Sequence, residues 1–165
     1  MLYPLSYEGG GASLRHRRGT RGWQYHGPVA DGIVLVVDDD AVILKLLQVN
    51  FSLEGYVVIA AQGGAEALRL AREEAPDVVV LDVMMPGIDG LEVARQLQAD
   101  PSTAHLPILL LSAKAQVSDI DAGRELAGDY VTKPFDAIDL LDRVGALVAR
   151  RRSAVRCGDP RIAEG

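Results

Sequence analysis

Short apolar runs and amphipathic segments alternate five times between residues 33 and 150, and this alternation constrains the fold more than any other feature of the chain. The runs are rich in Val, Ile and Leu, and three of them are apolar at nearly every position, as strands buried on both faces must be. They comprise residues 33–37, 56–60, 78–81, 107–111 and 129–132. The pattern therefore predicts a parallel sheet of five strands covered by helices.

The segments between and after these runs place apolar residues at helical spacing. In the last segment the period is carried by Ile138, Leu141, Val144 and Val148, and Asp136 is the candidate N-cap. The predicted helices comprise residues 41–53, 64–74, 91–98, 115–126 and 136–150. Because crossovers between parallel strands are right-handed, the economical arrangement is a doubly wound α/β sheet with helices on both faces.

Charge divides the chain into an acidic body and basic ends. Residues 31–149 contain 20 Asp and Glu against 8 Lys and Arg, a net charge of −12, whereas the two ends together hold 9 basic and 3 acidic residues, a net charge of +6. Phosphodiester backbones are bound by Lys and Arg, so an acidic body is a poor surface for them. We therefore expect no direct nucleic-acid binding by the folded part.

Composition also predicts the domain organisation and the compartment. Residues 1–31 lack any apolar period and are predicted to form a disordered or loosely packed basic extension, followed by one folded domain over residues 32–150. The last residues, 151–165, form a short tail that we expect to carry no output domain. No apolar run approaches the roughly 18 residues that span a bilayer, and the single cysteine, Cys157, cannot form an internal disulfide. A cytoplasmic protein without membrane insertion is expected.

Polar side chains follow four of the five predicted strands. They are Asp38, Asp39 and Asp40 after the first strand, Asp82 after the third, Ser112 at the end of the fourth and Lys133 after the fifth. Ligand sites of open α/β sheets lie outside the carboxyl ends of the strands, so these groups should converge. Carboxylates brought so close repel one another unless a cation lies among them, and Mg²⁺ is the hard, oxygen-preferring cation that fits.

The same residues suggest phosphoryl chemistry. With a metal present, Asp82 would stay ionised and act as a nucleophile toward phosphorus. The Lys133 ammonium and the Ser112 hydroxyl could contact the charged phosphoryl oxygens, and the break at Pro86 and Gly87 leaves the acceptor open and places the Met84 carbonyl near the metal. Each residue alone has an ordinary structural alternative, as a turn former, a cap or a surface charge. The joint arrangement favours the functional interpretation.

Four stretches carry a resemblance to a known family: "LVVDDD", "VVVLDVMMPGIDGLE", "ILLLSAKA" and "YVTKPF". In this order they resemble the receiver domain of two-component response regulators, and the resemblance covers roughly residues 32–150. It implies a flavodoxin-like fold with strand order 2-1-3-4-5 and five helices. It also implies a regulatory domain rather than an enzyme, one that catalyses only its own phosphorylation and dephosphorylation.

The resemblance assigns a role to each acidic residue of the site. Asp82 would be the phosphoryl acceptor. Asp38 and Asp39 would hold Mg²⁺ together with Asp82 and the backbone carbonyl of Met84, and no other cofactor is implied. Asp40 stands where the family often has an acidic residue that is not a direct ligand.

The resemblance implies that the remaining site residues contact the phosphoryl group or move in response to it. Lys133 would pair with it, Ser112 would move to hydrogen-bond it, and Tyr130 would change rotamer with that movement. Ala113 is the small residue that leaves room for this motion, and the bond between Lys133 and Pro134 is implied to be cis. One departure is a Ser112 to Lys133 spacing of 21, one residue shorter than is usual, which affects the fourth helix and the loop after it.

Partners follow from the same resemblance. The phosphoryl donor would be a sensor histidine kinase or a phosphotransfer protein. The face formed by the fourth helix, the fifth strand and the fifth helix would then change its contacts with a downstream protein, or form a phosphorylation-dependent homodimer.

An enzyme is the strongest alternative. The stretch "VVDDDAV" also fits the Asp-x-Asp-x-Val motif of haloacid-dehalogenase-like phosphatases, in which Asp38 would be the nucleophile and Asp40 the acid/base. That interpretation leaves "LDVMMPGIDG" without a role. A P-loop nucleotide site is disfavoured because the chain has no Gly-x-x-x-x-Gly-Lys-Ser/Thr stretch.

Overall fold

A five-stranded parallel sheet forms the centre of the molecule. In the computed structural model, which describes residues 31–113 and 127–156, the strand order is β2-β1-β3-β4-β5. The strands are β1 (Ile33–Val37), β2 (Val57–Ala61), β3 (Val78–Asp82), β4 (Ile108–Ser112) and β5 (Asp129–Thr132). Every neighbouring pair is parallel, which confirms the predicted doubly wound sheet.

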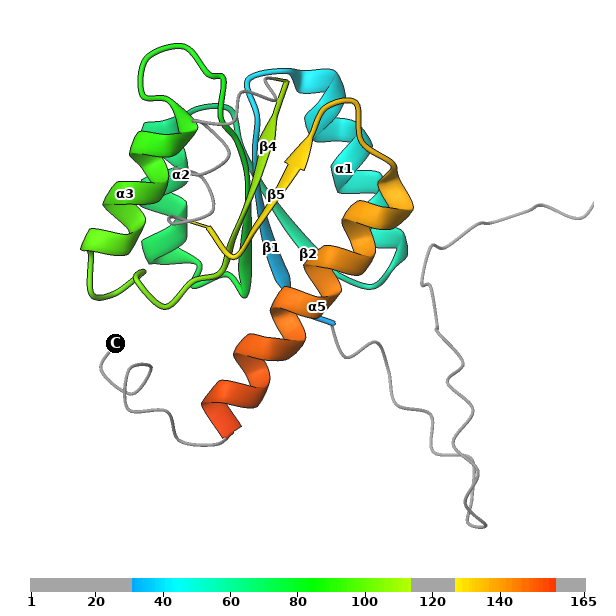
Figure 1. Ribbon diagram of the computed structural model, residues 1–165, viewed down its shortest axis with the longest axis vertical. Helices are drawn as coiled ribbons and strands as arrows, with labels where there is room; N and C mark the ends of the chain where they lie inside the picture. Colours follow the sequence, from blue (N-terminus) through cyan, green and yellow to red (C-terminus); the bar gives the residue numbers. More distant parts are fainter. Residues whose placement is uncertain (1–30, 114–126, 157–165) are drawn as a thin grey trace, which may run out of the picture.

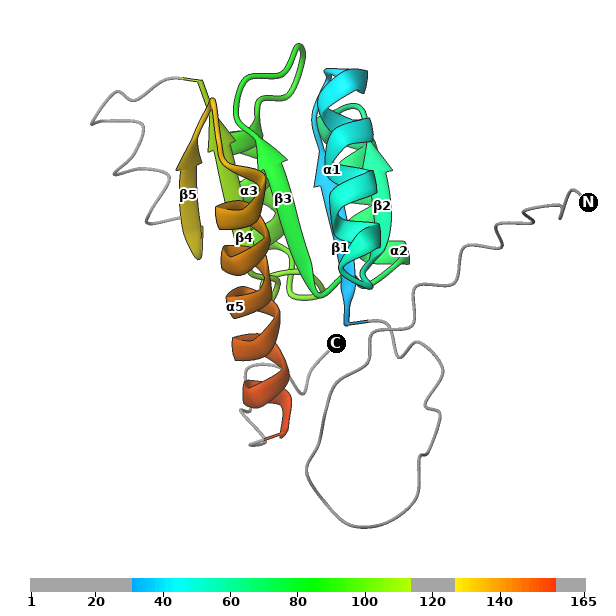
Figure 2. The same cartoon turned by 90° about the vertical axis from the view of Figure 1, so that its right-hand side faces the viewer.

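Helices cover both faces of the sheet, α2 and α3 on one and α1 and α5 on the other (Figures 1 and 2). Their bounds are α1 (Ala41–Leu53), α2 (Gly64–Glu73), α3 (Gly90–Ala99) and α5 (Ala137–Arg156). The predicted helix over residues 115–126 falls outside the described residues. Among those that the structure describes, no helix combines the length and the apolarity needed to cross a membrane.

Strand residues alternate between two hydrophobic clusters, one on each face. On β3, Val79 and Leu81 pack toward α2 and α3, whereas Val78 and Val80 pack toward α1 and α5. All four side chains have no exposed surface. A strand buried on both faces must be apolar at every position, which accounts for the continuous Val and Leu runs.

The last helix differs from its prediction in two respects. It begins as expected, with the Asp136 carboxylate accepting hydrogen bonds from the Ile138 and Asp139 amides at 2.8 and 3.1 Å. It ends at Arg156 rather than Arg150. Ile138, one of the four residues that carry the predicted apolar period, is 71% exposed, and the buried stripe is formed by Leu140, Val144, Leu147 and Val148.

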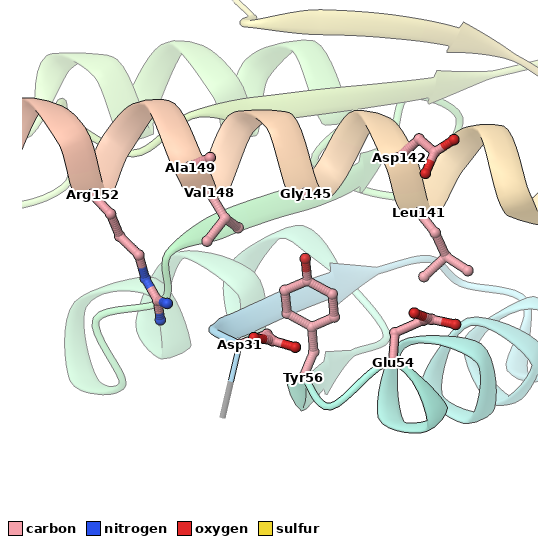
Figure 3. A pocket seen from close by; sticks show the side chains of 9 residues that line it. All are labelled: Asp31, Glu54, Tyr56, Leu141, Asp142, Gly145, Val148, Ala149 and Arg152. Atoms are coloured by element: carbon pink, nitrogen blue, oxygen red, sulfur yellow. The ribbon is translucent and has the colours of Figure 1, made fainter. Parts of the chain in front are cut away.

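A cavity of about 410 Å³ lies where α5 faces the end of α1 and the start of β2 (Figure 3). Tyr56 stands at its centre, and the small residue Gly145 on α5 lies opposite the phenol. The charged side chains around it are mostly acidic and comprise Asp31, Glu54, Asp142 and Arg152. This acidic cavity lies at the amino ends of the strands, away from the predicted site.

Candidate functional site

The carboxyl ends of four strands bring the predicted site residues to one edge of the sheet. Val37, next to Asp38, pairs with Leu81 of β3, and Asp82 pairs with Leu111 of β4. The end of β4 then pairs with the end of β5 through Ser112 and Thr132. Register alone therefore places Asp38, Asp82, Ser112 and Lys133 side by side.

Three carboxylates gather at this edge. One oxygen from each of Asp38, Asp39 and Asp82 lies within 4.8 Å of the others. Asp38 and Asp82 are almost fully buried, whereas Asp39 is exposed and faces solvent. The group is therefore rigid on the protein side and accessible from outside.

Lys133 reaches into this group from the loop after β5. Its Nζ donates to Asp38 Oδ2 at 2.7 Å and lies 3.2 Å from Asp82 Oδ1. Its amide donates to the Ser112 carbonyl at 2.7 Å, which ties the end of β5 to the end of β4. The peptide bond that follows, to Pro134, is cis, as expected.

Burial and neighbouring charges shift the pKa values of Asp82 and Lys133. Burial raises the pKa of the Asp82 carboxyl, and the negative charge of Asp38 raises it further, although Lys133 opposes both effects. Burial acts to lower the pKa of the Lys133 ammonium, but its hydrogen bond to Asp38 and the charge of Asp82 outweigh that effect and raise it. The charged forms of the two residues therefore depend on each other.

The donor set fits a divalent cation. Three carboxylates and one ammonium sum to a charge of −2 within one small group. Only oxygen ligands are offered, which is the preference of Mg²⁺, and a dication would cancel the excess charge. The Met84 amide donates a hydrogen bond to the Asp82 carboxylate, so this part of the loop is oriented toward Asp82.

Asp40 has a different role from its two neighbours. Its carboxylate accepts hydrogen bonds from the amides of Val42 and Ile43 at 2.8 and 3.4 Å and so forms the N-cap of α1. Its own amide donates to Asp38 Oδ1 at 2.8 Å. A capping carboxylate is poorly placed for the acid/base role that the phosphatase alternative requires.

Comparison with known proteins decides the family. Residues 34–145 match the model of the response regulator receiver domain. The chain belongs to this family. It is 47% identical over 122 residues to the Bacillus subtilis alkaline phosphatase synthesis transcriptional regulatory protein PhoP, covering 73% of this chain and 50% of that protein. It is 49% identical over 118 residues to the response regulator MprA of Mycolicibacterium vanbaalenii, covering 71% of this chain and 50% of that one.

Solved structures agree with this assignment. The receiver domain of the Francisella response regulator 1452 superposes with a TM-score of 0.67 at 34% identity, over 72% of this chain and 98% of that one. Vibrio cholerae chemotaxis protein CheY4 superposes with a TM-score of 0.66 at 29% identity, over 70% and 97% of the two chains. The receiver family is regulatory rather than catalytic, and its members are phosphorylatable signalling switches. The phosphatase alternative is not supported.

The chain spans about half the length of the curated relatives that it matches. PhoP is named as a transcriptional regulatory protein, and a Synechocystis relative, RpaA, is named as a DNA-binding regulator. The expectation of no direct nucleic-acid contact rested on the acidic body of this receiver domain. It is not supported for a full-length protein.

One residue of this receiver site was missed as a functional candidate. A Cβ atom at Gly90, the first residue of α3, would lie 2.1 Å from the backbone oxygen of Asp82 and 2.8 Å from Val83 Cα. The Gly90 amide donates to the Val83 carbonyl at 2.9 Å, so the loop after Asp82 closes back on its own strand. The Asp-Gly pair in the motif marks a turn, but sequence alone does not show which backbone the glycine touches.

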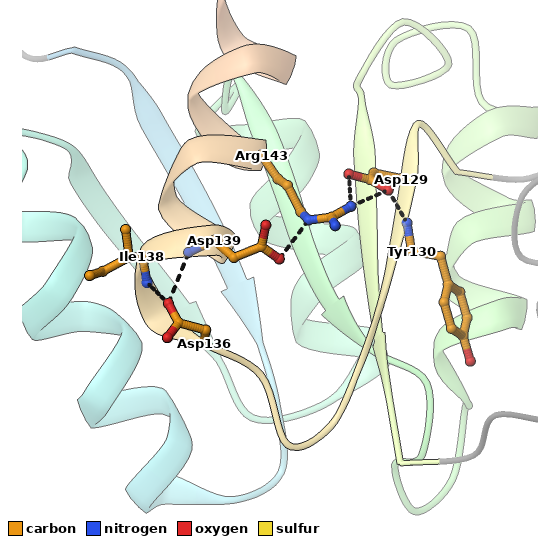
Figure 4. A network of polar contacts seen from close by, with 6 residues as sticks. All are labelled: Asp129, Tyr130, Asp136, Ile138, Asp139 and Arg143. Atoms are coloured by element: carbon orange, nitrogen blue, oxygen red, sulfur yellow. Dashed lines mark hydrogen bonds and ion pairs between the residues drawn. The ribbon is translucent and has the colours of Figure 1, made fainter.

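Ser112 and Tyr130 occupy neighbouring strands. The Ser112 side chain is almost fully buried at the end of β4, and the next residue, Ala113, is exposed. Tyr130 is half-buried on β5 and packs against the cluster on the α2 and α3 face. Figure 4 shows its ring directed away from the polar network of Asp129 and Arg143.

Proposed function

We propose that this receiver domain accepts a phosphoryl group on Asp82 from a sensor histidine kinase or a phosphotransfer protein, in a Mg²⁺-dependent reaction. The observation that carries the proposal is the group of Asp38, Asp39 and Asp82, whose carboxylate oxygens lie within 4.8 Å of one another, with the Lys133 ammonium 3.2 Å from the acceptor. Such a group has little structural benefit, because burying like charges together is costly. Its arrangement suits transfer of a doubly charged phosphoryl group to one fixed nucleophile.

The acceptor chemistry follows from the positions of the side chains. An Asp82 oxygen forms the new O–P bond while the N–P bond to the imidazole of the donor breaks. The Lys133 ammonium is already in contact with the acceptor, so it can stabilise charge on the transferred group without a large movement. The Ser112 hydroxyl, one strand away, would donate a hydrogen bond to the group after transfer.

Asp38, Asp39, Asp82 and the Met84 carbonyl would hold the metal. A bound Mg²⁺ would supply the positive charge that the ammonium alone cannot. The protein would contribute four oxygen ligands, from three carboxylates and one backbone carbonyl. With the metal bound, the domain would catalyse its own phosphorylation and dephosphorylation.

The proposed functional unit is the receiver domain over residues 32–150. The basic extension over residues 1–31 and the tail over 151–165 lie outside this unit, although α5 continues to Arg156. No role in the phosphoryl chemistry is proposed for either.

The output would be a change of contacts on the face formed by the helix predicted over residues 115–126, which lies outside the described residues, together with β5 and α5. On that face, Arg143 of α5 donates to both Asp129 oxygens of β5 at 3.0 and 3.2 Å and to Asp139 at 2.8 Å (Figure 4). The arginine side chain is 40% exposed, and such surface ion pairs contribute only about 0–1 kcal/mol. The pairs can therefore be exchanged at small cost for pairs with a downstream protein or a second copy of this chain.

The test is incubation of the full chain with Mg²⁺ and acetyl phosphate, followed by intact mass measurement. We expect a single phosphoryl adduct that is lost in Asp82→Asn and retained in the exposed control Asp142→Asn. An adduct that persists in Asp82→Asn, or that forms equally with EDTA present, contradicts the proposal. If the phosphorylated chain dimerises, size-exclusion should show it, and Arg143→Ala should weaken that dimer more than the exposed control Arg95→Ala.

A further inference from the structure

A second cavity lies at the opposite end of the sheet from the acceptor. It has a volume of about 320 Å³ and is bounded by the segments before β4 and β5 and by the C-terminal half of α5. We call it the basal cavity. Its apolar wall is formed mainly by Leu106, Pro107 and Leu147. A cavity of this size is within the range of sites for small molecules or for one side chain of a peptide.

The polar groups of the basal cavity are all basic or neutral. They are Arg150 and Arg151 of α5 and His105 of the loop before β4, and none of the described residues that line the cavity is a carboxylate. The contrast with the rest of the domain is large, because residues 31–149 carry a net charge of −12 and the other cavity is lined mostly by acids. A local positive site on an acidic body selects for anions.

Arg151 is held in place by several contacts. Its Nη1 donates to the Pro76 carbonyl and lies 3.4 Å from Asp77 Oδ1, and its side chain is only 13% exposed. Asp77 is itself fixed by the Ile33 amide at 2.9 Å and lies 3.6 Å from Arg152. The guanidinium is therefore oriented before any ligand arrives, which reduces the ordering cost of binding.

His105 completes the basic edge. Its Nε2 lies 3.1 Å from Arg151 Nη2, a contact in which the neutral ring accepts a hydrogen bond from the arginine. Burial lowers the pKa of the His105 imidazole, and the charge of Arg151 lowers it further. Among the described residues, Asp77 pairs with Arg151, which lies between it and His105. Arg150 is exposed and has no ion pair among the residues that the structure describes. Arg150 is thus available to an anion, and His105 becomes a second cationic donor when protonation of its ring replaces the contact with Arg151.

We propose that the basal cavity binds a carboxylate carried on a small apolar body. The basic edge would hold the carboxylate, and the apolar wall would contact the body. Inorganic phosphate is a poorer match, because it would leave the Leu and Pro wall without a partner. A carboxylate bound here would accept hydrogen bonds from two cationic groups, and such charge-assisted bonds are the stronger ones.

Carboxylate binding beside His105 should depend on pH. An anion beside His105 favours the protonated ring, so binding raises the pKa of that imidazole. By reciprocity, binding must become tighter as the pH falls through the titration of His105. A carboxylate held by arginine alone would show no such dependence near neutral pH.

The experiment uses the full chain with benzoate as the probe and benzamide as its uncharged counterpart. The ring protons of His105 are followed by NMR between about pH 5.5 and pH 8, the range in which histidine titrates. We expect a saturable shift with benzoate, tighter at the lower pH, and little response to benzamide. Equal responses to the two compounds, or a benzoate shift that does not saturate, overturn the proposal.

Two variants distinguish specific binding of benzoate in the basal cavity from nonspecific attraction to positive charge. Arg150→Gln and Arg152→Gln remove the same charge from positions two residues apart on α5, but only Arg150 of the two lines the basal cavity. We expect Arg150→Gln to weaken benzoate binding about tenfold and Arg152→Gln to change it less than about twofold, since one charged hydrogen bond is at stake. Equal losses in the two variants would reduce the effect to nonspecific charge and refute the site. His105→Gln, followed by calorimetry, should bind benzoate without the pH dependence, and a dependence that survives refutes the linkage.

Discussion

Gly90→Ala tests how closely Gly90, at the start of α3, packs against the backbone of Asp82 at the end of β3. The added methyl carbon would lie 2.1 Å from the Asp82 carbonyl oxygen and 2.9 Å from the Asp82 carbonyl carbon, where real contacts essentially never fall below 3.0 Å. The obstructing atoms are backbone, so they cannot rotate away. Either the start of α3 or the end of β3 must move by about 1 Å to restore an ordinary contact.

The size of the effect follows from that displacement. Overpacking of this kind costs about 1–3 kcal/mol of unfolding free energy. At roughly 4 °C per kcal/mol for a domain of this size, the melting temperature should fall by about 4–12 °C. Because the displaced atoms carry Asp82, the proposed acceptor, a shift of about 1 Å should also slow labelling by acetyl phosphate by on the order of 100-fold.

Gly145→Ala is the matched control. A methyl carbon there would meet only the Tyr56 hydroxyl at 3.4 Å, an ordinary contact, in the interior of α5. Replacing glycine by alanine inside a helix should stabilise the protein by about 0.5–1 kcal/mol. Urea unfolding of the two variants and the wild type should therefore give changes of opposite sign. Equal stability of Gly90→Ala and wild type, with unchanged labelling, would refute the close contact.

Three further changes probe the site and its surroundings. Mg²⁺ should raise the melting temperature of the wild type, because binding at a hundredfold excess over its dissociation constant adds about 2.7 kcal/mol to the free energy of unfolding. Asp38→Asn should lose most of that gain, and an equal Mg²⁺ effect in the variant contradicts the ligand assignment. Met84 is apolar and cannot orient an attacking water, so Met84→Asn should shorten the lifetime of the phosphoryl adduct, and equal lifetimes by mass measurement would reject this. The hydrogen bonds from Arg72 and Ser102 lower the pKa of Asp100 to about 2, so its stabilising effect is present above the unfolded pKa near 4 and is lost as the pH falls toward 2. Acid unfolding of Asp100→Asn should accordingly depend less on pH in that interval, and an unchanged acid transition would count against the contact.

The fold could be predicted because burial acts on every strand position. The continuous Val and Leu runs permit only strands covered on both faces, and alternation with helical segments then leaves few topologies. The convergence of Asp38, Asp82 and Lys133 followed from the same rule, since parallel strands end at one edge. These features depend on chain order and polarity, which a sequence displays directly.

What could not be predicted depends on contacts between distant or backbone atoms. The first part of α5 supports two overlapping apolar stripes that share Val144 and Val148, and only the position of the sheet decides that Leu140 is buried while Ile138 is exposed. Gly90 was missed for a similar reason, since its neighbour is a backbone oxygen. The length of α5 was underestimated because its last turns are basic, although Arg151 secures them through the Pro76 carbonyl and Asp77.

The β4 and β5 ends link the acceptor to the proposed output face by a short path. Lys133 contacts both Asp38 and Asp82, and its amide is bonded to the Ser112 carbonyl. A phosphoryl group on Asp82 would add negative charge to a group that already sums to −2, so the ammonium would be drawn toward the new oxygens and away from Asp38. Any such movement acts at one end of a four-residue strand whose other end is Asp129, the partner of Arg143. Because that ion pair is exposed and weak, we expect a small displacement at Lys133 to bias which partners the arginine prefers.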